Sequence, residues 1–326
     1  MRLPAGVCSL ALALALAATP LHSAEKIRVA YPAVAPGLAP LLVTGAAGMW
    51  EKYGLDVELI LVSGGARAVP ALISNSVQFL MASDTGVTQA ILQGIPLTRL
   101  GVTTNTLGSS LVVQPGIQSV KDLKGKVLGI SMGRDLSYAR LAKVLRDNGL
   151  SPTEDVKLLP IGGGEPGRFS TLKAERIHGT MLFPPFDLMA RNAGMNVLVK
   201  LDIPSPAGGV NTTPAFLKQK RELVIDFVKG YMEGIRYMTR HKEESVRVFF
   251  KYFKNPDRAA MEYLYDETVS RLAKDLRPTP DSIRYHFDIA ALDDPRAKQL
   301  SEKDFWDSSV VEEIHRSGFV DQLYKK

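Results

Sequence analysis

The chain repeats one pattern of strands and turns about 100 residues further on, and this internal repeat limits the folds it can adopt. A period of this length corresponds to a whole α/β lobe, because solenoid repeats are only roughly 20 to 50 residues long. Two similar lobes in one chain predict a clamshell. Three pairs of segments carry the repeat: 26–31 and 126–131, 57–65 and 156–164, and 75–81 and 175–181.

The first 24 residues have the composition of a cleavable export signal. Arg2 is the only charge before Glu25, an apolar run covers residues 7–18, and Ala24 is a small residue at the expected cleavage point. The run is too short to span a bilayer, which takes about 20 apolar residues. We therefore expect a signal peptide over residues 1–24 and a mature protein in the bacterial periplasm.

Cysteine is absent from the expected mature chain. Cys8, the only cysteine, lies inside the apolar run and not just after it, so a lipid-anchored cysteine is not expected. Disulfides, thiol catalysis and thiolate metal sites are excluded together. Removing residues 1–24 takes away one arginine and no acidic residue, which leaves 302 residues with a net charge of +5. This modest charge slightly favours an anionic ligand, and its even spread argues against a nucleic-acid partner.

Strand and helix patterns alternate through the first 200 residues, and this alternation predicts α/β lobes with mostly parallel sheets flanked by helices. Beyond residue 211 the pattern is helical. The expected strands are 27–31, 57–62, 77–82, 127–130, 156–159, 179–182 and 197–199; the expected helices are 38–52, 66–73, 85–93, 135–148, 218–239, 243–253, 257–274 and 280–292.

Two segments that are polar or rich in Pro and Gly, residues 103–110 and 203–209, bracket the second lobe. The chain is therefore expected to cross between lobes twice, and two crossings make a hinge. The predicted division is a discontinuous lobe I, residues 25–108 and 205–326 including the C-terminal helices, and a lobe II of residues 109–204.

Three segments resemble a known family of exported proteins. Residues 48–58, GMWEKYGLDVE, look like the early helix-to-strand motif of the solute-binding proteins that serve ABC importers for taurine, alkanesulfonates, nitrate and thiamine pyrimidine precursors. Residues 116–126, GIQSVKDLKGK, are similar to the motif that introduces the second lobe of that family, and residues 304–324 are similar to its end.

The resemblance implies a two-lobed periplasmic binding protein fold of type II. It also implies a monomer that closes on a small organic solute and delivers it to an ABC permease in the inner membrane, without catalysis or a cofactor. A ligand-sensing module read by a membrane receptor is the alternative from another class. An enzyme of pyrimidine metabolism is a further alternative. It is disfavoured because this chain lacks the cysteine-rich motif of the yeast-type relatives.

The chain departs from the resembled family at one repeated position. The family carries an acidic residue after the turn before the third strand of a lobe, where this chain has Gln78 and His178. These positions look structural, so only a local turn contact is in doubt.

A ligand of an open α/β sheet lies beyond the carboxyl ends of the strands, facing helix N-termini. The glycines and hydroxyls of those loops allow backbone amides to approach a ligand, although the serines and Asp84 are also ordinary helix N-caps. Tyr31 and Phe183 are expected to form an apolar wall, with core packing as the alternative for Phe183. The candidate ligand-binding residues are Tyr31, Pro36, Gly64, Gly65, Arg67, Ser83, Asp84, Thr85, Ser131, Gly133, Arg134, Gly163 and Phe183.

Arg67 and Arg134 carry the most specific expectation. Each lies in the first turn of an expected helix, where the helix dipole disfavours a cation unless an anion is bound. An arginine fork suits carboxylate, sulfonate or phosphate oxygens. The alternative is a solvated side chain paired with Asp84 or Asp135.

Catalytic and metal-binding patterns are absent from the sequence. The four histidines after the signal, at positions 178, 241, 286 and 315, lack metal-ligand spacing, and neither a Gly-x-Ser-x-Gly elbow nor a phosphate loop occurs. We therefore expect no enzyme activity and no metal.

Overall fold

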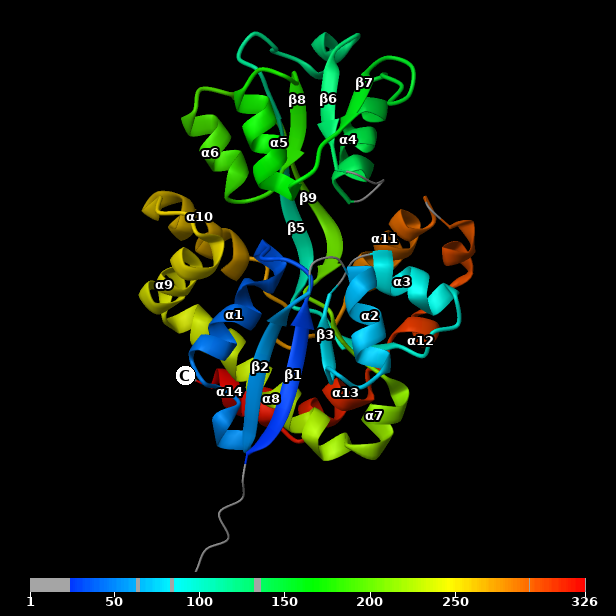
Figure 1. The fold of residues 1–326 in the computed structure, drawn as a ribbon, viewed down its shortest axis with the longest axis vertical. Helices are drawn as coiled ribbons and strands as arrows, with labels where there is room; N and C mark the ends of the chain where they lie inside the picture. Colours follow the sequence, from blue (N-terminus) through cyan, green and yellow to red (C-terminus); the bar gives the residue numbers. More distant parts are fainter. Residues whose placement is uncertain (1–23, 63–64, 83–84, 132–135, 293, 326) are drawn as a thin grey trace, which may run out of the picture.

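The computed structural model describes residues 24–62, 65–82, 85–131, 136–292 and 294–325. The protein has two lobes, each built around a five-stranded sheet (Figure 1). The sheet of lobe I has the order β2-β1-β3-β10-β4, made from β1 (Glu25–Tyr31), β2 (Leu55–Leu61), β3 (Phe79–Met81), β4 (Thr98–Gly101) and β10 (Val210–Thr212). The sheet of lobe II has the order β7-β6-β8-β5-β9, made from β5 (Thr104–Val113), β6 (Val127–Ile130), β7 (Lys157–Pro160), β8 (Gly179–Leu182) and β9 (Asn196–Ala207).

Helices cover both sheets, and all helices after β10 pack on lobe I. Those between the strands are η1 (Pro36–Leu38), α1 (Ala39–Ala46), η2 (Glu51–Tyr53), α2 (Gly65–Ile73), α3 (Thr85–Leu92), η3 (Val120–Leu123), α4 (Leu136–Asp147), α5 (Gly164–Lys173) and α6 (Phe186–Asn192). The C-terminal segment contains α7 (Pro214–Gln219), α8 (Arg221–Arg240), α9 (Lys242–Phe253), α10 (Arg258–Val269), α11 (Pro280–Ala290), η4 (Pro295–Gln299), α12 (Glu302–Phe305), α13 (Ser309–Arg316) and α14 (Phe319–Tyr324). No helix of the described residues is long and apolar enough to cross a membrane.

The expected mostly parallel sheets are confirmed. In lobe I, β1 pairs in parallel with β2 and with β3, and in lobe II β6 pairs in parallel with β7 and with β8. One strand of each sheet, β10 in lobe I and β5 in lobe II, pairs antiparallel with both of its neighbours, which makes both sheets mixed.

The two lobes are joined by a long antiparallel pair, β5 and β9 (Figure 1). Its register extends from Thr104 opposite Ala207 to Val113 opposite Asn196. The sequence analysis assigned no strand to residues 103–110, although their threonines favour extended structure. The prolines of residues 203–209 are accommodated because β9 is an edge strand, where a missing N–H breaks no ladder. The expected lobe boundaries stay a prediction.

The repeated turn before the third strand is built twice with the same geometry. Asn75 and Glu175 both have a left-handed backbone, with φ of 57° and 58°. Gln78 accepts a hydrogen bond at Oε1 from the Arg28 N–H (2.9 Å), and His178 accepts one at Nδ1 from the Val127 N–H (3.3 Å). The turn contact that the departure from the family put in doubt is therefore present in both lobes.

The motif at residues 48–58 fixes the C-terminal segment to lobe I. Trp50 is 2% exposed, donates from Nε1 to the carbonyl oxygen of Phe227 (2.9 Å) and stacks on the Phe227 ring. Gly230 is required one turn further along α8, because a Cβ there would lie 2.4 Å from the Trp50 ring. The expected helix over residues 38–52 ends early, at Ala46, and continues as a turn and η2.

The motif at residues 116–126 forms a capping box. Ser119 is the N-cap of η3, and the Asp122 carboxylate accepts hydrogen bonds from the N–H groups of Gln118 (3.1 Å) and Ser119 (2.9 Å). These hydrogen bonds lower the pKa of Asp122, since they favour its charged form.

Candidate functional site

The strand ends of the two lobes face each other. In Figure 1 the carboxyl ends of β1 and β6 are directed toward the opposite lobe. The loops that follow these strands and their neighbours contain the candidate ligand-binding residues. This is the place where an α/β protein binds a ligand.

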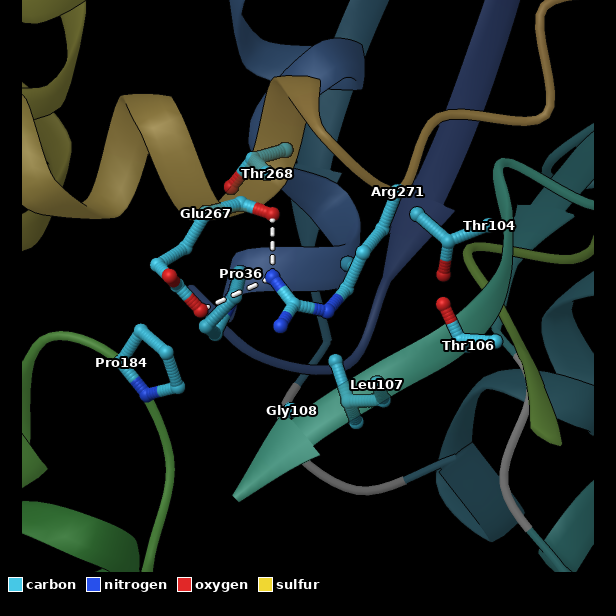
Figure 2. A pocket seen from close by; sticks show the side chains of 10 residues that line it. Pro36, Thr104, Thr106, Leu107, Gly108, Pro184, Glu267, Thr268 and Arg271 are labelled. Carbon is cyan, nitrogen blue, oxygen red and sulfur yellow. Dashed lines mark hydrogen bonds and ion pairs between the residues drawn. The ribbon is translucent and has the colours of Figure 1, made fainter. Parts of the chain in front are cut away.

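A pocket between the lobes lies beside the hinge strand β5 (Figure 2). It has a cavity volume of about 20 Å³, which is room for about one water molecule. Lobe I supplies the loop after β1 and the end of α10, and lobe II supplies the loop after β8. The lining residues are Pro36, Gly37, Thr104, Thr106, Leu107, Gly108, Pro184, Glu267, Thr268 and Arg271.

Arg271 forms the charged wall of this pocket. Its Nη1 donates to the carboxylate and to the carbonyl oxygen of Glu267, both at 2.8 Å, and its Nε donates to Asp202 of β9 at 3.1 Å. Gly108 allows the guanidinium to lie against β5, because a Cβ there would be 2.9 Å from Nη2. The paired carboxylates raise the pKa of Arg271 against the opposing effect of burial.

Thr104 adds a polar group that has no partner. It is 2% exposed, and its hydroxyl makes no hydrogen bond to any described residue. Figure 2 shows the hydroxyls of Thr104 and Thr106 near each other at the edge of the pocket. An unpaired buried hydroxyl is destabilising unless a ligand or water satisfies it, so this pocket suits a polar group.

Arg140 of α4 is bonded to the backbone of the pocket residue Leu107 and is fully buried, at 0% exposure. Its Nη1 donates to the carbonyl oxygen of Leu107 (2.6 Å) and to the hydroxyl of Ser109 (2.7 Å), and its guanidinium carbon lies 5.1 Å from the centre of the Phe183 ring. Two further nitrogens, Nε and Nη2, make no close hydrogen bond to a described residue, and Tyr285 of α11 is the polar side chain that interacts with the guanidinium from lobe I.

The surroundings of Arg140 come from both lobes. Burial lowers its pKa to about 10, while Tyr285 of α11, Asp202 and Glu165 act in the opposite direction. The guanidinium is therefore charged at neutral pH, and no carboxylate of the described residues forms an ion pair with it. A buried charge of this kind favours an anion.

Arg168 of α5 is a further buried arginine of lobe II. It is 2% exposed, its Nη1 donates to the Ser131 hydroxyl (2.6 Å), and its Nη2 lies 3.5 Å from the Glu165 carboxylate. Its Nε has no partner in the described part of the chain. Ser131 also contacts Ser137 of α4 at 3.3 Å, so the hydroxyls lie between the two arginine-bearing helices.

The structure places five of the predicted site residues in different surroundings. Ser131 and Phe183 lie in lobe II, beside Arg168 and Arg140 respectively. Pro36 lines the pocket, and Gly163, with φ of 77°, immediately precedes α5. Tyr31 is 5% exposed and packs in the lobe I core, away from the pocket lining.

The other predicted residues are only partly described. Gly65 and Arg67 lie in α2 and Thr85 begins α3, but their side chains are outside the described structure. The remaining predictions fall outside the described residues: Gly64, Ser83, Asp84, Gly133 and Arg134.

Sequence reasoning missed Arg140, Arg168 and Arg271. It searched the first turns of helices, whereas Arg140 and Arg168 lie in the second. A usable signal was present, because Arg168 precedes the buried Leu172 by four residues and Arg140 precedes the buried Val144 by four. An arginine on the apolar face of a helix must be paired or functional. Among the described residues, no group of His, Cys, Asp and Glu could hold a metal.

Comparison with known proteins gives one family and a consistent fold. The family model described as NMT1/THI5 like matches residues 35–245. The putative aliphatic sulfonates-binding protein of Bacillus subtilis is 22% identical over 90% of this chain and 90% of its own length. The riboflavin-binding protein RibY of Chloroflexus aurantiacus is 24% identical over 64% of this chain, and the match spans 60% of RibY.

Solved structures agree on the fold. The structure described as a putative sulfonate ABC transporter's periplasmic sulfonate-binding protein, SsuA, from Methylobacillus flagellatus has a TM-score of 0.68 to this chain. The match covers 92% of this chain and 96% of that one, at 18% identity. The two-lobed periplasmic binding protein fold is therefore confirmed.

Proposed function

The chain belongs to the NMT1/THI5-like family, and we propose that it is the substrate-binding component of an ABC importer. In this role it captures a small organic anion between its lobes and delivers it to a membrane permease. The family, the two-lobed fold and the relatives that bear the names of sulfonate- and riboflavin-binding proteins support the role. The anionic character of the ligand rests on Arg140.

Arg140 supports an anionic ligand because its charge is buried and incompletely paired. A guanidinium at 0% exposure with two unsatisfied nitrogens is destabilising until an acceptor reaches it. Its position at the strand ends of lobe II, with Tyr285 of lobe I beside it, places the charge where the lobes meet. A carboxylate or sulfonate supplies two oxygens in the geometry of an arginine fork.

A thermal-shift screen tests the proposed function. The probes are aliphatic sulfonates, aliphatic and aromatic carboxylates, nitrate, riboflavin and pyrimidines. A ligand present at 100 times its dissociation constant stabilises the fold by about 2.7 kcal/mol, and a hit should be recovered chemically unchanged. Conversion of the hit by the purified protein would contradict the proposal.

Arg140→Met then tests the anion site. We expect a loss of affinity of roughly 10 to 150 fold for an anionic hit, the equivalent of about 1.5 to 3 kcal/mol for hydrogen bonds to a charged group. Arg146→Met is the matched control, because Arg146 is an exposed arginine on the same helix. Equal affinities of Arg140→Met and Arg146→Met for the ligand would show that Arg140 does not bind it.

Arg67 and Arg134 stay proposed partners of the same anion. Alanine at either position should weaken binding by roughly 10 to 150 fold, and lysine should not fully replace a two-pronged arginine contact. Calorimetry on these variants and on Arg140→Met shows which arginines contact the ligand. Unchanged affinity with an intact fold would show that Arg67 and Arg134 do not contact the ligand.

The export signal is part of the proposal. Residues 1–24 should be absent from the protein isolated from its native cell, and N-terminal sequencing should start at Glu25. A chain that keeps residues 1–24 and stays in the cytoplasm would contradict a periplasmic role.

A further inference from the structure

Lobe I holds lobe II at a second place besides the hinge, through helix α10. α10 belongs to lobe I, because Met261, Leu264 and Tyr265 pack in one cluster with Ala39 and Val43 of α1. α10 also contacts α6 of lobe II, the helix that follows the loop after β8. Figure 1 shows α10 below α6, beside the hinge strands.

A hydrogen bond between Tyr263 and Asp187 forms the centre of this contact. The Tyr263 hydroxyl of α10 donates to Asp187 Oδ2 of α6 at 3.1 Å. The same oxygen accepts from the Ser110 hydroxyl of β5 at 2.9 Å, and Oδ1 accepts from the Leu188 N–H at 2.8 Å. Burial and the nearby carboxylate raise the pKa of Tyr263, so its hydroxyl keeps the proton it donates.

Asp187 depends on Tyr263 because it has few other partners. Its side chain belongs to a residue that is 5% exposed, and no lysine, arginine or histidine in the described residues forms an ion pair with it. If the lobes moved apart, this buried carboxylate would lose one of two hydroxyl donors. The loss of a hydrogen bond to a charged group opposes separation.

Two further contacts lie on the same flank. Asn255, in the turn before α10, points its Nδ2 at the Met189 sulfur of α6 at 3.2 Å. Arg271, just after α10, bonds Asp202 of β9 at 3.1 Å. The three contacts therefore join α10 and its flanking turns, in lobe I, to α6 and β9 of lobe II.

We propose that the Tyr263–Asp187 hydrogen bond is a latch that holds the two lobes together independently of any ligand. Both partners of this hydrogen bond belong to the protein, so the bond is present without ligand. Its free energy therefore contributes to the equilibrium between molecules with joined lobes and molecules with separated lobes. A ligand that binds between the lobes then acts on an equilibrium that the latch has already biased.

Distance measurement between the lobes tests the latch. Residues 25–326 contain no cysteine, so Lys173→Cys in lobe II and Lys251→Cys in lobe I, both at exposed positions, give a unique pair of spin-label sites. Pulsed electron spin resonance on the exported protein, without added ligand, reports the distribution of distances between them. Tyr263→Phe removes only the hydroxyl that forms the latch.

Tyr265→Phe is the matched control on the same helix. The Tyr265 hydroxyl donates to the Met238 carbonyl oxygen at 2.8 Å, so this variant loses a hydrogen bond inside lobe I. We expect the ratio of separated to joined lobes to rise by about tenfold in Tyr263→Phe and to stay unchanged in Tyr265→Phe. Identical distributions in both variants, or the same change in both, would overturn the latch.

Discussion

Among the described residues, one arginine in each lobe has an exposure of 0%, and these two arginines differ in where their partners come from. Arg99 of lobe I donates from Nε to the Asn211 side chain (3.0 Å) and from Nη2 to the Ala82 carbonyl oxygen (3.1 Å), with the Phe305 ring 4.5 Å away. All these partners belong to lobe I. Arg140 of lobe II has Phe183 and the hinge strand on one side and Tyr285 of lobe I on the other.

The difference shows that burial alone does not mark a site. Arg99 is part of a network in which Asn211 also donates to the carbonyl oxygens of Leu80, Ala82 and Gly209, and this network joins β10 to β3. The proposed lobe movement would leave its surroundings unchanged. It would alter the surroundings of Arg140, because Tyr285 belongs to the other lobe.

The largest expected effect is loss of stability when the structural arginine is removed. Arg99→Met leaves the Asn211 amide oxygen and the Ala82 carbonyl oxygen without this donor inside the core. We expect the free energy of unfolding to fall by about 3 kcal/mol and the melting temperature by roughly 6 to 12 °C. Arg284→Met, at an exposed position of α11, is the control, and equal melting temperatures for the two variants would contradict the structural role.

The second prediction concerns pH and the neighbour of Arg99. His286 is 5% exposed and bonds Thr88 at 2.7 Å; burial, aided by the charge of Arg99, holds its pKa well below the usual 6.5. The unfolded chain therefore binds a proton near pH 6.5 that the folded chain does not bind. Stability is constant above that pH and falls below it, by at most about 1.4 kcal/mol per pH unit.

Urea unfolding at several pH values below 7 checks this effect. His286→Gln should remove part of the slope. His241→Gln, at an exposed position, should leave it in place. The same slope in wild type and His286→Gln would assign the pH dependence to other groups.

The third prediction compares the two copies of the repeated turn. His178→Leu and Gln78→Leu each leave one backbone N–H without its side-chain acceptor, so each should lower the free energy of unfolding by about 1 kcal/mol. His178→Gln copies the lobe I turn into lobe II and should be nearly neutral. Unequal losses for the two leucine variants would show that the turns are alike only in geometry.

The smallest expected effect on stability belongs to Arg140. Its removal loses two hydrogen bonds but also a buried and incompletely paired charge, and these two effects oppose each other. Arg140→Met should therefore change the free energy of unfolding by less than about 1 kcal/mol while weakening ligand binding. A loss as large as that of Arg99→Met would make both arginines structural.

The strands and helices that depend on local apolar patterns could be predicted from the sequence. The parallel strands of both lobes were predicted from short apolar runs, and helices α8, α9, α10 and α11 from apolar residues at helical spacing. Strand β5 was missed, and β9 was predicted only at residues 197–199, because the threonines and prolines of these segments also suit a loop. Only the pairing of residues 83 to 103 positions apart makes them a ladder.

The site was less accessible to sequence reasoning. Pro36, Ser131 and Phe183 follow strands, so their general position could be predicted from the strand pattern alone. The helix pattern could single out Arg140, but its partners could not be predicted, because Leu107 and Ser109 of β5 and Tyr285 of α11 are distant from α4 in sequence. The proposed roles of Arg67 and Arg134 stay predictions.

The position of β10 determines the order in which the lobes can be completed as the chain is made. β10 lies between β3 and β4, so the first sheet stays in two pieces until residues 210–212 insert between strands made more than 100 residues earlier. The second sheet uses only residues 104–207 and is complete before that insertion. A nascent or translocating chain is therefore expected to finish its middle lobe first, and the lobe that contains the N-terminus last.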